Sequence, residues 1–110
     1  MMWYRLQGRE IVPIGNTPSE IHDTWARVAE TVVKSVHIST VFLGLDHSYG
    51  GGPPITFETM VFGGKLNETQ VRYCTYDEAE RGHQRIVRRV RRAEQGELER
   101  AIAKVRRRKN

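Results

Sequence analysis

The segment from residue 36 to residue 74 constrains the fold of this 110-residue chain more than any other part. Apolar residues alternate with polar or small ones over 36–45, 55–62 and 70–74, which is the two-residue period of β-strands. Two glycines and an asparagine separate the second run from the third, as at a turn. Because connections this short join antiparallel neighbours, we predict an antiparallel meander.

The N-terminal third combines a hairpin pattern with a helix-start signal. Residues 3–14 alternate around a central glycine, which predicts a β-hairpin. The sequence Thr17-Pro18-Ser19-Glu20 is a capping box with a proline suited to the first helical position. Apolar residues at helical spacing follow it, so we predict a short helix over about 18–31.

A second capping box opens the C-terminal third. Thr75 and Glu78 form the box, and an apolar stripe at helical spacing then runs to Ala93. Gly96 interrupts the stripe, which resumes from Leu98 onward. Either one long helix has a soft point at the glycine, or two helices meet there.

These elements predict an α+β fold in one domain over residues 1–110, with an antiparallel sheet packed against a short N-terminal helix and a long basic C-terminal helix. A helix of about 30 residues reaches ~45 Å, which exceeds the width of a small domain. Residues 97–110 are therefore expected to form a helical tail or dimer arm. We expect a homo-oligomer, at least a dimer, in which these helices exchange contacts.

The net charge of +5 is concentrated in the C-terminal third. Residues 1–75 carry six Lys/Arg and seven Asp/Glu, whereas residues 76–110 carry twelve and six. A polyanion, or a small ligand with several phosphates, would meet that end of the molecule first.

Four arginines follow one face of the predicted C-terminal helix, beside its apolar stripe: Arg81, Arg85, Arg88 and Arg92. They form either a solvated surface that pairs with Glu78 or a row of guanidiniums for phosphate. No recognised DNA-binding motif is present, and aromatic residues do not interleave with the basic face. A small phosphate-bearing ligand is therefore favoured over nucleic acid.

Cysteine, histidine and hydropathy patterns exclude several classes of protein. Cys74 is the only cysteine, so no internal disulfide can form, and the usage fits a reducing cytoplasm. The histidines are scattered and no metal-ligand spacing occurs, so we expect no metal. No apolar run approaches the ~20 residues that span a bilayer, and no signal peptide is visible, so we expect no membrane association.

A loop rich in glycine and proline joins the first two predicted strands of the meander. Its glycines, Gly50 to Gly52, either aim backbone amides at an anion or supply the positive φ angles of a turn. Asp46 and His47 read either as an acid–base pair or as residues that cap the strand and bond to the turn. Because no nucleophile or orienting group completes a catalytic set, we predict that the protein is not an enzyme.

Three segments resemble a family of small phage and prophage proteins: WYRLQGREIVPI at 3–14, HISTVFLGLDHSYGGGPPITFETMVFGG at 37–64 and RYCTYDEAERGH at 72–83. The likeness extends over residues 3–90 and excludes the basic tail. This family is similar to the Thoeris anti-defence proteins, which are phage-encoded signal sponges.

The resemblance implies a small α+β dimer in the host bacterial cytoplasm that binds a cyclic ADP-ribose isomer and withholds it from the host's effector. It implies neither catalysis nor a cofactor. Such a ligand carries phosphates, an adenine and ribose hydroxyls. The expected ligand-binding residues are the cations Arg5, Arg85, Arg88 and Arg92, the ring of Phe57, and the hydroxyl partners Asp46, His47 and Asn67.

Two other functions remain open on the sequence. The arginine-rich helix could bind an acidic or nucleic-acid-binding surface of a host nuclease, which would make the protein an inhibitor. Alternatively, the protein could be a small nucleic-acid-binding phage accessory protein, whose affinity would fall steeply with salt.

Overall fold

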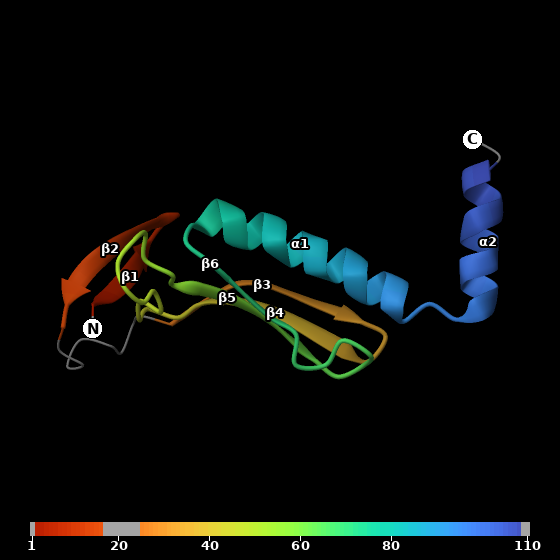
Figure 1. The fold of residues 1–110 in the computed structure, drawn as a ribbon, viewed down its shortest axis with the longest axis horizontal. Coiled ribbons are helices and arrows are strands. Elements are labelled where there is room, and N and C mark those ends of the chain that lie inside the picture. Colours follow the sequence, from red (N-terminus) through yellow and green to blue (C-terminus); the bar gives the residue numbers. More distant parts are fainter. Residues whose placement is uncertain (1, 17–24, 109–110) are drawn as a thin grey trace.

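The computed structural model describes residues 2–16 and 25–108 of the chain. Figure 1 shows an antiparallel sheet with one helix lying along it, a hairpin at one end and a second helix at the other. The elements in chain order are β1 (Trp3–Gln7), β2 (Glu10–Gly15), β3 (Ala26–Val33), β4 (Val36–Phe42), β5 (Phe57–Phe62), β6 (Gln70–Tyr73), α1 (Tyr76–Ala93) and α2 (Glu97–Arg108).

The predicted meander is present as strands β4, β5 and β6, and β3 extends it to a four-stranded sheet in the order β3-β4-β5-β6. All neighbours are antiparallel, and Phe42 pairs with Phe57, which in turn pairs with Tyr73. Side chains along β4 alternate between buried and exposed or half-buried positions. The two-residue alternation in the sequence therefore reflects a sheet that is covered on one face.

The predicted hairpin is also present, as the separate two-stranded sheet β1-β2. It is attached to the end of β4 by main-chain hydrogen bonds: the amide of Tyr4 donates to Gly44 at 2.7 Å, and the amide of Asp46 donates to Met2 at 3.1 Å. The hairpin thus continues the meander beyond its last regular pair.

Helix α1 covers one face of the four-stranded sheet (Figure 1). Its Ile86, Val87 and Val90 pack with Val36, Ile38 and Val61 in one apolar cluster. A second cluster contains Phe42, Phe57, Tyr73 and Ala79.

A polar network separates these two clusters. Both ring nitrogens of the buried His83 are hydrogen-bonded, Nε2 to the Thr31 hydroxyl at 2.8 Å and Nδ1 to the Thr40 hydroxyl at 2.7 Å. Thr40 also bonds to Thr59, which accepts a hydrogen bond from the Tyr73 hydroxyl at 3.1 Å. Because every member has a partner, burying these polar groups carries little penalty.

The short N-terminal helix predicted over 18–31 is wrong: β3 occupies Ala26–Val33. The capping box at 17–20 lies outside the described residues. A β-bulge between Arg27 and Ala29 explains the misleading pattern. Val28 packs into the Phe42 cluster, and Ala29 pairs with the buried Thr40. The bulge places two adjacent apolar residues on the same side of the strand, and in the sequence this resembles the spacing of apolar residues along a helix.

The long basic C-terminal helix is also wrong, because two helices, α1 and α2, meet near Gly96. Glu94 ends α1 with non-helical angles, φ −91° and ψ 0°. Its carboxylate accepts a hydrogen bond from the amide of Lys65 at 2.7 Å, and its carbonyl accepts one from Lys34 Nζ at 2.7 Å. These bonds anchor the end of α1 to the sheet, while α2 projects away from it (Figure 1).

Candidate anion-binding cleft

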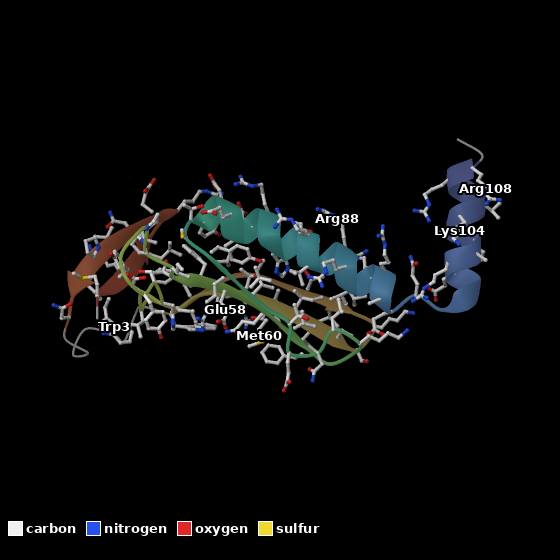
Figure 2. The ribbon with its side chains drawn as sticks, in the orientation of Figure 1. Trp3, Glu58, Met60, Arg88, Lys104 and Arg108 are labelled. Carbon is white, nitrogen blue, oxygen red and sulfur yellow. The ribbon has the colours of Figure 1, made fainter. Side chains whose placement is uncertain are left out.

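A cleft of about 720 Å³ lies between the end of α1 and α2. Its walls are mostly cationic, with two apolar side chains and one amide: Leu66, Arg89, Arg92, Ala93, Gln95, Arg100, Lys104 and Arg107. Figure 2 marks Lys104 on α2 and Arg88 on the side of α1 that faces away from the sheet. The cleft thus joins residues from two helices and from the turn after β5.

Among the described residues that line the cleft, none is a carboxylate that could balance its positive charge. Within the described part of the chain, the ion pairs use Arg9, Arg27, Lys34, His37 and Arg72, and none uses a cleft residue. Cations held together without counter-charges repel one another, so an anionic ligand would relieve this repulsion as it binds.

Helix spacing explains how the sequence builds these walls. On α2, Arg100, Lys104 and Arg107 stand at i, i+4 and i+7, which places them on one face. Arg89 and Arg92 stand three residues apart near the end of α1, where the helix dipole favours cations.

Gly64 lets the turn after β5 lie close to the end of α1. Its φ is +71°, and a methyl group at this position would overlap the Glu94 carboxylate and the Val36 side chain. Lys34 Nζ also pairs with Glu99 of α2 at 3.4 Å. The turn after β5 and the turn between β3 and β4 therefore contact the region where α1 joins α2 from two sides.

Of the cations predicted to bind ligand, only Arg92 lines the cleft. Arg85 and Arg88 are exposed on α1 and line a separate hollow of about 440 Å³. Arg5 is exposed on β1, where its guanidinium lies 3.4 Å from the side-chain oxygen of Gln7. Figure 1 places β1 at the end of the molecule opposite α2.

The carboxylate of Asp46 closes its own loop instead of facing a ligand. It accepts hydrogen bonds from the amide of Ser48 at 2.8 Å, the hydroxyl of Ser48 at 2.9 Å and the amide of Ile55 at 2.9 Å. Burial acts to raise the pKa of Asp46, but these donors together hold it below its usual value. The amide of His47 donates to the carbonyl of Ile55 at 2.8 Å. This geometry favours the structural interpretation of Asp46, and it ties the backbone of His47 to the same loop.

The side chains of Phe57 and Asn67 likewise have structural roles. The Phe57 ring is 0% exposed and packs against Phe42, with ring centroids 5.3 Å apart, and against Tyr76. A ring in this position cannot stack on a ligand. The Asn67 side-chain oxygen accepts a hydrogen bond from the amide of Gly63 at 2.7 Å and so closes the turn after β5.

The predicted ligand-binding residues therefore lie in separate parts of the molecule, and four of the five cations of the cleft were missed. Arg89 lies off the face that the predicted arginine row defines, and Arg100, Lys104 and Arg107 belong to a segment read as a tail. The signal that could have found the three cations on α2 was their i, i+4, i+7 spacing beside the apolar stripe of that helix.

Two further properties of the described residues bear on function. They contain no cluster of three or more His, Cys, Asp or Glu side chains that could hold a metal ion. No helix in residues 25–108 combines the length and the apolar character needed to cross a membrane.

Comparison of the chain with protein-family models, with curated proteins and with solved structures gives no match.

Proposed function

We propose that this protein binds a phosphate-bearing small ligand in the cleft between α1 and α2 and sequesters it without changing it. The observation that carries this proposal is the group of five cations around a space of about 720 Å³, with no carboxylate among the described residues that line it. This volume falls within the ~300–1,000 Å³ of typical small-molecule sites.

The lining residues supply complementary chemistry for a nucleotide. Guanidinium groups hold phosphate oxygens through paired hydrogen bonds, and the Lys104 ammonium adds a point charge. Leu66 and Ala93 offer apolar surface for a base or sugar, and the Gln95 amide can both donate and accept. Apart from the Lys104 amine, none of the lining residues carries a side chain that serves as a nucleophile or a general base, which supports binding over catalysis.

The resemblance to phage signal sponges identifies the first ligand to test as a cyclic ADP-ribose isomer. Its phosphates match the clustered cations, and its size suits the cleft. On this proposal the protein acts in the host bacterial cytoplasm and lowers the free concentration of the signal.

The experiment is calorimetric titration of cyclic ADP-ribose isomers, with inorganic pyrophosphate as a second probe. We expect binding by the wild type and a loss of about tenfold or more in affinity for each of Arg100→Gln and Arg107→Gln. The variant R5Q/K65Q, whose exposed cations lie outside the cleft, should bind like the wild type. Equal affinity in all variants would move the site away from the cleft.

Sequestration is tested separately by heating the loaded protein and identifying what it releases. Intact nucleotide in the supernatant supports a sponge. Recovery of a cleaved product would make the protein an enzyme, and failure of both probes to bind would overturn the proposed function.

We also propose that α2 packs against α2 of a second copy. Its Ile102 and Val105 are 43% and 52% exposed, and a helix of 12 residues is marginally stable alone. Acidic residues stand near its start and arginines fill its last turn. An antiparallel pair therefore brings unlike charges together along the apolar seam.

A further inference from the structure

We propose that the outer face of α1 is a second contact surface, which binds the phosphate backbone of duplex nucleic acid regardless of sequence. The surface, here called the arginine row, consists of Arg81, Arg85 and Arg88. This inference goes beyond the small-ligand function, because none of the three residues lines the cleft.

The position of the arginine row is fixed by the packing of α1. The opposite face of the helix is buried through Gly82, His83, Ile86, Val87 and Val90. The helix cannot turn without exposing this face, so the row stays directed toward solvent. Figure 2 shows Arg88 on the side away from the sheet.

The row lines a shallow hollow of about 440 Å³ together with Glu80 and Gln84. The only carboxylate of this hollow is already paired, because Arg9 bridges Glu80 and Asp77. None of the ion pairs within residues 2–16 and 25–108 uses an arginine of the row. The ion pairing with Glu78 that a solvated surface would use is not formed. Arg81 lies close enough to Asp77 to help lower the pKa of that carboxyl, so Arg85 and Arg88 are the two charges available to a polyanion.

The shape of the surface favours a duplex over a single strand. The spacing i, i+4, i+7 spreads the charges over about 10 Å along the helix axis. Duplex DNA presents about one phosphate per 1.7 Å of its axis, so several phosphates lie within reach of the row. The residues that line the hollow include no aromatic ring on which an unpaired base could stack.

The test is fluorescence anisotropy of a labelled DNA duplex titrated with the full chain at several salt concentrations. We expect the affinity to fall linearly on a log–log plot against salt. In R85Q/R88Q the slope should decrease in magnitude by about 2, because each lost phosphate contact on B-DNA contributes about 0.9. Binding of the small phosphate ligand by this variant should be unchanged.

The matched control is R5Q/K65Q, which removes the same charge from exposed positions outside the arginine row. It should keep the salt slope of the wild type, and thermal unfolding should be cooperative in both variants. An equal change of slope in the two variants would show that net charge alone drives binding and would overturn the proposal. Tighter binding of a single strand of the same length would overturn the assignment to a duplex.

Discussion

Gly82 has no side chain, and this lets α1 lie close to β6. A methyl group there would overlap the ring of Tyr73, whose hydroxyl belongs to the His83 network. Tyr73 is buried and bonded, so it has little freedom to move aside. The close approach of helix and sheet at this point depends on one residue.

Gly82→Ala should destabilise the protein. The substitution gains about 1 kcal/mol of helix propensity, but overpacking against a fixed ring costs about 1–3 kcal/mol. Urea unfolding should show a net loss in the free energy of unfolding. Gly96→Ala is the matched control, because the space around that glycine is open. A Gly82→Ala protein at least as stable as the wild type would mean that Tyr73 can rearrange.

His83 should make stability depend on pH. Burial lowers the pKa of His83 from its usual value of about 6.5, so the unfolded chain binds the proton more readily than the native state. The free energy of unfolding should therefore be unaffected by this group above pH ~6.5 and should decrease as the pH falls below it.

His83→Gln tests this assignment, since it removes the titrating group and keeps hydrogen-bonding capacity. The variant should be less stable at neutral pH, and its stability should no longer decline just below pH ~6.5. The pKa of Asp46 is lowered as well. The stability that its carboxylate contributes is lost only at more acidic pH, below its usual pKa of about 4. If the stability of His83→Gln still declines below pH ~6.5 as in the wild type, another group is responsible for the titration.

At the level of elements, the sequence predicts a helix or strand correctly where the residues that begin or end the element are its own neighbours in the chain. The Thr75 hydroxyl accepts a hydrogen bond from the amide of Glu78 at 3.1 Å, and Asp77 and Glu78 lie in the first turn of α1. The N-cap bond of the predicted capping box is therefore present in the structure. Strand β3 is the opposite case, because its bulge is visible only once β4 is paired with it.

Thr75→Ala should cost about 1 kcal/mol of stability, because one of the first amides of α1 loses its acceptor. Thr75→Ser keeps the hydroxyl and should stay close to the wild type. Chemical denaturation of the three proteins side by side is the measurement. Equal stabilities would show that water replaces the cap at no cost.

At the level of the whole molecule, two apolar surfaces remain uncovered by the described residues. One is the seam of α2, with Ile102 and Val105. The other is the sheet face away from α1, where Val32 and Phe62 are more than half exposed. Figure 2 shows Met60 on that same face. A second copy of the chain could cover either surface.

Ile102→Glu should convert the proposed dimer into a monomer, because it buries a charge in the seam of the paired helices. Light scattering after size exclusion gives the mass. Phe62→Glu is the comparison, since it places the same charge on the sheet face. If only Phe62→Glu dissociates the assembly, the second copy packs on the sheet and the assignment to α2 is wrong.

The sequence by itself determined the strands β4 to β6, the hairpin, the start of α1 and the basic C-terminal third. Those features depend on residue periodicity, capping and charge, which act between neighbours in the chain. Tertiary structure alone decided that residues 26–33 pair as a strand, and it decided between the two interpretations that the sequence left open for Asp46. It also brought Arg89 and Arg92 together with the cations of α2, because the angle between two helices depends on contacts from Lys34 and Lys65, far away in the sequence.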